Sequence, residues 1–182
     1  MDIKVLAPED TKGATRWDAF VFACPNATFF HRSGWQSILR DVFRHPTYFI
    51  YAEENGEILG VLPLAHIDSL LFGNALIALP FAVYGGVASE HPVAIKALEK
   101  EAQRLARQLG VDHLEFRNLR SQHPDWPSQD LYVTFRKEIL PDVEANMLAI
   151  PRKQRAMVRK GVKNGLTSTV DSTSERFFQL FA

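Results

Sequence analysis

An Asn55-Gly56 pair stands between two apolar runs, residues 48–53 and 58–67, and constrains the fold of this chain more than any other feature. Asn-Gly favours positive φ at both positions, as a two-residue hairpin turn requires. The flanking runs are therefore predicted to be antiparallel neighbours in one sheet. A second turn at Phe72-Gly73-Asn74 leads into a short apolar run, residues 75–79, which predicts a three-stranded meander.

A long amphipathic helix is predicted directly after the meander, over residues 92–109. Its apolar positions recur at alternating spacings of three and four residues, and they are Ile95, Leu98, Ala102, Leu105 and Leu109. Gly110 follows at the position where a helix commonly ends in a left-handed residue. A strand is predicted next, over residues 111–116.

The remaining elements are read from shorter patterns. We expect strands at 2–6, 131–139 and 166–171, and helices at 15–24, 33–43, 141–150 and 173–181. Trp17, Phe20 and Val21 are expected to face inward. A meander followed by a helix and a further strand favours an α/β (α+β) fold, with a mixed, mainly antiparallel sheet flanked by helices. It does not favour a doubly wound parallel sheet.

Length and composition fit an ordinary globular protein. The 182 residues suit one domain, or one domain and part of a second, and 46% of them are hydrophobic. The single cysteine, Cys24, cannot form an internal disulfide. The first ten residues lack the apolar stretch of a signal peptide, and the longest apolar run, 75–84, is too short to span a membrane. We therefore expect a cytoplasmic protein.

Positive charge is concentrated between residues 151 and 165. Six basic residues and no acidic residue fall in this stretch: Arg152, Lys153, Arg155, Arg159, Lys160 and Lys163. The whole chain has 21 basic and 21 acidic residues, so the rest carries 15 basic (21 less these six) against 21 acidic. Pro151 suits the start of a helix, and Gly165 suits the stop after it.

On such a helix four of the cations, Arg152, Arg155, Arg159 and Lys163, form one stripe. Arginine binds phosphate and carboxylate oxygens in a two-pronged manner, so the stripe is typical of a polyanion-binding surface. A solvated helix face, with cations near its negative end, remains the alternative.

Several kinds of site are not indicated. There is no phosphate-binding GxxxxGK[ST] loop, no GxGxxG and no GxSxG. The six histidines show no metal-ligand spacing, and we expect no metal and no tightly bound cofactor. Gly85-Gly86 fits a turn or bulge, or a close approach of backbone to a ligand. The aromatic residues Phe29, Phe30, Trp35 and Phe43 fit a core cluster or, alternatively, a wall for a sugar or acyl group.

Three segments together resemble the FemAB family of aminoacyltransferases, in particular the branch associated with PEP-CTERM/exosortase systems. They are FFHRSGWQSILRDVF (29–43), GVLPLAHIDSLLFGNALIALPFAVYGGVAS (60–89) and PRKQRAMVRKGVKNGL (151–166). The first is similar to an early helix of the family that carries a tryptophan, and the second is the most specific of the three. The third is similar to a basic segment of the family. The likeness covers nearly the whole chain.

The resemblance implies two tandem GNAT-like acyltransferase units. Residues 1–145 would form the first, and 146–182 would form a linker helix and the opening of a truncated second, so we expect this stretch to be inactive alone. Family enzymes extend the peptide of a cell-wall (peptidoglycan) precursor with aminoacyl-tRNA as donor. The acceptor implied here is a nucleotide- or lipid-linked cell-wall or exopolysaccharide precursor. The acyl-CoA signature of ordinary GNAT enzymes is absent, but acyl-CoA remains an alternative donor to aminoacyl-tRNA.

The expected substrate-binding residues are Arg152, Arg155, Arg159 and Lys163 for phosphate, and Trp35, Tyr84, Gly85 and Gly86 for the groove lining. No residue is indicated as the catalytic base. Acyl transfer to an amine needs a held carbonyl and a stabilised oxyanion, and a backbone N–H freed by a strand bulge could supply the latter. Two other functions stay open. One is a non-catalytic RNA- or polyanion-binding module that uses the basic helix, and the other is a structural role in cell-surface assembly. Peripheral membrane contact and tRNA as a partner are also possible.

Overall fold

The computed structural model describes residues 1–69, 71, 73–120, 122–129 and 132–181, and the chain divides into two compact units. They are Met1–Trp126 and Pro127–Ala182, and each is described by itself. This division differs from the expected ranges 1–145 and 146–182. The assignment of those ranges to two GNAT-like units stays a prediction.

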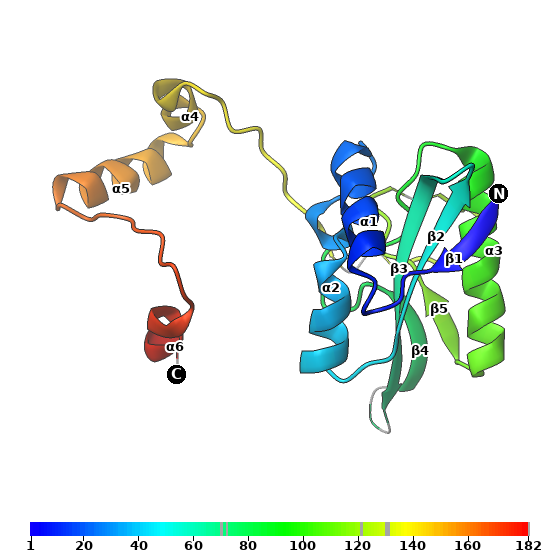
Figure 1. Cartoon of the computed structure of the whole chain (residues 1–182). Coiled ribbons are helices and arrows are strands. Elements are labelled where there is room, and N and C mark those ends of the chain that lie inside the picture. Colours follow the sequence, from blue (N-terminus) through cyan, green and yellow to red (C-terminus); the bar gives the residue numbers. More distant parts are fainter. Residues whose placement is uncertain (70, 72, 121, 130–131, 182) are drawn as a thin grey trace. The chain divides into compact units, whose positions relative to one another are not determined.

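The first unit consists of a five-stranded sheet and the helices that flank it (Figure 1). In chain order its elements are β1 (Asp2–Val5), α1 (Thr11–Ala23), the 3₁₀ turn η1 (Phe29–His31), α2 (Gly34–Ser37), the π turn η2 (Ile38–Val42), β2 (Thr47–Glu54), β3 (Glu57–Ser69), β4 (Gly73–Ala78), α3 (Pro92–Leu109) and β5 (His113–Glu115). The predicted order of strand, two helices, three strands and long helix is therefore confirmed. Two strands were predicted to follow, and only the first of them, over 111–116, is present, as β5.

The sheet follows the order of the chain, β1-β2-β3-β4-β5. The first four strands pair antiparallel, and β4 and β5 pair parallel, with Ala75 opposite His113 and Ile77 opposite Glu115. Asn55 and Gly56 join β2 to β3 with φ of 52° and 86°, as the hairpin prediction requires. The predicted mixed, mainly antiparallel sheet flanked by helices is confirmed. Phe72, part of the second predicted turn, lies outside the described residues.

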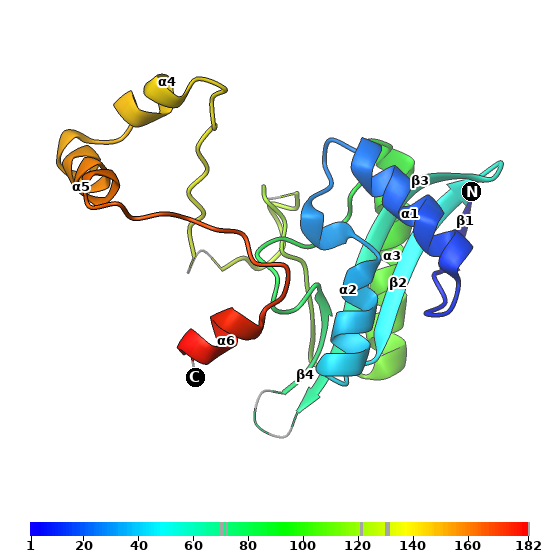
Figure 2. The same ribbon diagram turned by 60° about the vertical axis from the view of Figure 1, so that its left-hand side comes forward.

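Helices cover both faces of the sheet (Figure 2). Phe49 and Tyr51 of β2 pack with Trp17 of α1, whereas Ile50 and Ala52 pack on the opposite face with Leu98 of α3. Successive residues of a strand point to opposite faces, so β2 is apolar at consecutive positions because both of its faces are covered. The helix predicted over 92–109 is confirmed, and Gly110 ends it in the left-handed conformation with φ of 65°.

Two helices differ in detail from the prediction. Helix α1 begins at Thr11 rather than residue 15, because the Asp10 carboxylate accepts a 2.8 Å hydrogen bond from the Gly13 backbone N–H and caps the first turn. The helix expected over 33–43 becomes a π turn after Ile38, where the Phe43 N–H donates to the Ile38 carbonyl. A π turn inserts a residue and rotates the helix face, so Val42 is 69% exposed.

Two predicted strands are wrong. Residues 132–139 and 166–171 are irregular, and Leu131 lies outside the described residues. Both stretches carry β-formers, but a strand forms only when a neighbouring strand satisfies its backbone and a surface covers its apolar side chains. Tyr132 and Phe135 are 93% and 94% exposed, so neither condition is met there.

The second unit contains three short helices and no buried side chain among residues 127–129 and 132–181. The helices are α4 (Val143–Leu148), α5 (Arg152–Lys163) and α6 (Glu175–Phe181), which confirms the predicted helices in shortened form. Asp142 caps α4 through the Glu144 N–H, and Gly165 follows α5 with φ of 72°. Without a core, this unit depends on local hydrogen bonds.

A charge triad ties α1 to the β1–β2 edge of the sheet. The Glu53 carboxylate, whose side chain is 10% exposed, accepts hydrogen bonds from Lys4 Nζ and from Arg16 Nη2, the latter at 2.7 Å. Arg16 also donates to the Gly56 carbonyl at 2.6 Å. Hydrogen bonding from Lys4, and then from Arg16, holds the pKa of Glu53 below its ordinary value.

Replacement of this carboxylate should therefore produce a pH-dependent loss of stability. Because the folded-state pKa of Glu53 is depressed, its contribution is present above the unfolded carboxyl pKa of about 4.3 and is lost as pH falls through the folded value. We expect Glu53→Gln to lower the melting temperature at pH 7, and the difference from wild type to shrink as the buffer is acidified below that range. Thermal unfolding followed by circular dichroism at several pH values measures this. A difference that stays constant with pH would contradict the assignment.

Candidate substrate-binding site

An aromatic wall brings two of the predicted groove residues together. Trp35 is the second residue of α2, and its ring lies 5.6 Å from the ring of Phe30 in η1. The Phe30 ring in turn lies 6.4 Å from that of Tyr84, which follows β4. The Tyr84 hydroxyl is buried and has no hydrogen-bond partner within the described part of the chain. Trp35 and Tyr84, 49 positions apart in the sequence, thus belong to one cluster.

Gly85 and Gly86 approach protein atoms closely. A Cβ added to Gly85 would lie 2.1 Å from the Ala78 carbonyl oxygen, and one added to Gly86, which has φ of 124°, would lie 2.1 Å from Asn118 Oδ1. The Gly85 N–H donates to the Arg117 carbonyl at 2.9 Å. Gly85 therefore sits between the end of β4 and the chain that leaves β5. Because glycine has no side chain, the loop can pack this closely against neighbouring protein atoms.

His31 holds the glycine loop against η1. The Thr28 backbone N–H donates to His31 Nδ1 at 3.1 Å, so the proton of the neutral ring is on Nε2, which donates to the Gly86 carbonyl at 3.3 Å. Burial lowers the pKa of His31, against the opposing effect of these hydrogen bonds. The ring is therefore neutral at pH 7 and positions the loop rather than carrying charge.

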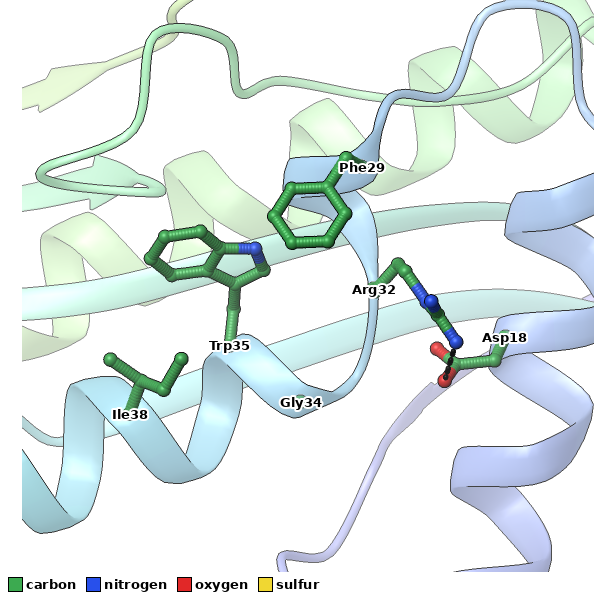
Figure 3. Close-up of a pocket in the computed structure, with 6 residues that line it drawn as sticks. All are labelled: Asp18, Phe29, Arg32, Gly34, Trp35 and Ile38. Carbon is green, nitrogen blue, oxygen red and sulfur yellow. Dashed lines mark ion pairs between the residues drawn. The ribbon is translucent and has the colours of Figure 1, made fainter. Parts of the chain in front are cut away.

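A small pocket opens beside this wall, between α1, η1 and α2 (Figure 3). Its volume is about 220 Å³, and it is lined by Asp18, Phe29, Arg32, Gly34, Trp35 and Ile38. Figure 3 shows the rings of Phe29 and Trp35 next to one another, with Arg32 directed toward Asp18. Of these residues, the sequence indicated only Trp35 as a groove residue and Phe29 as a cluster member. No short sequence pattern marks Asp18 and Arg32 as a pair. They come together only because α1 packs beside η1, which Arg32 directly follows.

The structure contains a strand bulge of the kind that could free a backbone N–H. The register of β2 and β3 shifts between Ala52 and Glu53, which leaves Leu59 as the extra residue of β3. The Leu59 carbonyl accepts a 2.6 Å hydrogen bond from the Ser89 hydroxyl, which also accepts from the His91 N–H at 3.0 Å. Ser89 thus ties this bulge to the start of α3.

The four predicted phosphate-binding residues all lie on α5 in the second unit. Arg152, Arg159 and Lys163 are exposed, and their side chains make no ion pair or hydrogen bond within the described residues. Arg155 differs, because its guanidinium donates to the Leu148 carbonyl at 2.8 Å and to the Ile150 carbonyl at 2.9 Å. Three cations of the stripe are therefore free to meet a ligand, and Arg155 closes the turn between α4 and α5.

Three further features concern metal binding, membrane spanning and thiol reactivity in the residues that the structure describes. They contain no group of three or more His, Cys, Asp or Glu side chains that could hold a metal ion. No helix among them is long and apolar enough to cross a bilayer. Cys24 is half-buried, and burial raises the pKa of its thiol, which disfavours the reactive thiolate.

No protein-family model matches the chain, and no curated protein matches it in sequence. Among solved structures it is similar to FemX, with 17% identity and a TM-score of 0.45 over 61% of this chain and 25% of FemX. It is also similar to a ribosomal-protein-alanine N-acetyltransferase from Brucella melitensis biovar Abortus 2308, with 14% identity and a TM-score of 0.48 over 74% of this chain and 100% of that one. An aminoglycoside 6′-N-acetyltransferase from Acinetobacter haemolyticus gives 12% identity and a TM-score of 0.47 over 76% and 99% of the two chains. The matched region thus spans one quarter of FemX.

Proposed function

We propose that this chain is part of a FemAB-type acyltransferase that transfers an aminoacyl or acyl group to an amine on a cell-wall or exopolysaccharide precursor. The membership of the PEP-CTERM/exosortase branch, the donor (aminoacyl-tRNA or acyl-CoA) and a cytoplasmic location belong to the same proposal. The resemblance of three sequence segments supports it, and so does the predicted order of strands and helices in the first unit. No catalytic base is assigned.

One observation carries the proposal: three cations in a stripe on α5 lack any protein partner in the described part of the chain. Unpaired Arg and Lys side chains on one helix face repel each other, so the arrangement costs free energy until an anion binds. A pyrophosphate, as in a nucleotide- or lipid-linked precursor, offers a compact anion of opposite charge. Arg155, bonded to two carbonyls, would set the angle at which α5 presents the stripe.

Charge reversal of the stripe tests this role. We expect Arg152→Glu, Arg159→Glu and Lys163→Glu together to weaken binding of uridine diphosphate N-acetylglucosamine, used as the probe, by at least about tenfold, or about 1.4 kcal/mol. Isothermal titration calorimetry measures this. The matched control reverses three exposed cations of α3, Lys96, Lys100 and Arg107, so that the net charge changes equally. If both triple variants lose the same affinity, only net charge matters and the proposed site is wrong.

A second function, RNA binding without catalysis, is favoured by the same free cations. It predicts tight binding of a single-stranded RNA with a steep salt dependence, because each neutralised phosphate contributes about −0.7 to the slope of log K against log salt. The α5 variant would then flatten that slope by about 2, for three lost contacts. Under the transferase proposal, RNA binding is weak in both proteins. Fluorescence anisotropy with a labelled RNA at 50 and 200 mM salt distinguishes the two functions.

A further inference from the structure

The pocket in Figure 3 combines an exposed aromatic surface with a compensated pair of charges. Asp18 Oδ2 and Arg32 Nη2 lie 3.6 Å apart, and Asp18 Oδ1 accepts a 2.7 Å hydrogen bond from the Ser33 N–H. The side chains of Asp18 and Arg32 remain 29% and 57% exposed. The pocket therefore offers both an acceptor and several donors at its rim, while the net charge of the pair is zero.

The apolar side chains that line the pocket are partly exposed to solvent. Phe29 is 67% exposed and Ile38 is 39% exposed, and the rings of Phe29 and Trp35 meet edge to face at 6.1 Å. The Trp35 indole N–H makes no hydrogen bond among the described residues. Ile38 is the first residue of the π turn η2 and forms one end of this apolar edge. A ligand can thus cover an aromatic face and reach a free donor at the same time.

We propose that this pocket binds one neutral sugar ring. The ring of a sugar has an apolar face of C–H groups, which packs on an aromatic surface, and a periphery of hydroxyls, which both donate and accept hydrogen bonds. Asp18 accepts from one hydroxyl, and Arg32 and the Trp35 N–H donate to others. The volume of about 220 Å³ lies below the usual range for drug-sized ligands, which limits the occupant to a single ring.

The charge balance selects against other ligands. Arg32 and Asp18 lie only 3.6 Å apart, so an anion that is attracted by Arg32 is also repelled by Asp18, and the reverse holds for a cation. An acyl chain would remove water from both charged groups and return no hydrogen bond, which is unfavourable. The inference rests on the proposed function in one respect, since a glycan-containing acceptor would present such a ring. It concerns only the first unit.

Saturation-transfer NMR on the full chain with methyl N-acetyl-β-glucosaminide and methyl β-glucoside tests the proposal. We expect transfer to the ring protons of at least one glycoside, and a dissociation constant that rises about fivefold or more in Phe29→Ser, as expected when an aromatic contact is lost. A separate variant, Asp18→Asn, should also bind the glycoside more weakly than wild type, because it replaces a charged hydrogen-bond acceptor with a neutral one. The matched control is Phe22→Ser, which removes a 95% exposed phenylalanine of α1 that does not line the pocket.

The glycoside measurements either support or refute the sugar site. Binding that is lost in Phe29→Ser and kept in Phe22→Ser supports the sugar site, and circular dichroism confirms that each variant is folded. The site is refuted if neither glycoside shows transfer, if both serine variants bind alike, or if sodium hexanoate displaces the glycoside at equal concentration. Retention of glycoside binding by the α5 charge-reversal variant keeps this site separate from the phosphate stripe. If charge reversal of α5 weakens binding of uridine diphosphate N-acetylglucosamine no more than charge reversal of α3 does, while the glycoside results hold, the proposed function is overturned and the sugar site stands.

Discussion

Trp17→Ala is expected to destabilise the first unit by about 3–5 kcal/mol, the range for truncating a large buried aromatic side chain. Trp17 is fully buried, and its ring lies 5.4 Å from the ring of Phe49 and 6.2 Å from that of Tyr51. Its indole N–H donates to the His31 carbonyl at 2.7 Å. The substitution therefore leaves both a cavity and a buried carbonyl without its donor, and the two costs add.

Urea unfolding followed by circular dichroism measures this loss. Since domains of this size are stable by about 5–15 kcal/mol, the alanine variant could be largely unfolded, and Trp17→Phe provides a milder test. That variant keeps most of the ring contacts but loses the hydrogen bond, so we expect an intermediate loss of about 1–3 kcal/mol. Phe22→Ala on the same helix, at a position 95% exposed, should change stability by less than about 0.5 kcal/mol. Equal effects at Trp17 and Phe22 would contradict the core assignment.

The parts of the fold that sequence predicts well are those in which one short pattern fixes the geometry. Asn55-Gly56 sets the hairpin because few other residue pairs adopt positive φ at both positions. The helix α3 follows from 18 residues with a regular apolar stripe and a glycine stop. Trp17 and Val21, four apart on α1, are buried as expected.

The failures have a common physical cause, which is dependence on a distant partner. Residues 132–139 have the composition of a strand, yet a strand gains its stability from a neighbour that local sequence does not reveal. The π turn after Ile38 is likewise set by how α2 packs, since Leu39 is buried and Val42 is not. Spacing alone predicted a regular helix through both positions.

In the candidate site, too, some features are predictable from the sequence and others depend on the folded chain. Trp35 stood out as a rare, large side chain at helical spacing, but its link to Tyr84 through Phe30 requires the folded chain. Asp18 and Arg32 are ordinary charged residues in the sequence and become a pair only across α1 and η1. The basic stripe was visible from spacing, whereas the bonding of Arg155 to the Leu148 carbonyl was not. Sequence therefore identified the residue types, and packing decides which of them act together.

Gly85→Ala is expected to destabilise the first unit by at least about 2 kcal/mol, because overpacking against backbone is relieved only by moving whole elements. The added Cβ would lie 2.1 Å from the Ala78 oxygen and 2.8 Å from the Ala78 carbonyl carbon, at the end of β4. Any shift of the loop away from Ala78 also disturbs the hydrogen bond from the Gly85 N–H to the Arg117 carbonyl. The substitution thus separates the two strand ends that Gly85 joins.

Gly34→Ala is the matched control, because a Cβ there meets no atom within 4 Å and the residue lies in the short helix α2. Alanine in a helix is favoured over glycine, so we expect Gly34→Ala to be neutral or to stabilise by up to about 1 kcal/mol. Chemical denaturation of both variants gives the comparison. If Gly85→Ala proves as mild as Gly34→Ala, the loop does not fill the space between β4 and the chain after β5. That space would then be open to a ligand, and the alternative explanation for the glycine pair, close approach of backbone to substrate, would replace internal packing.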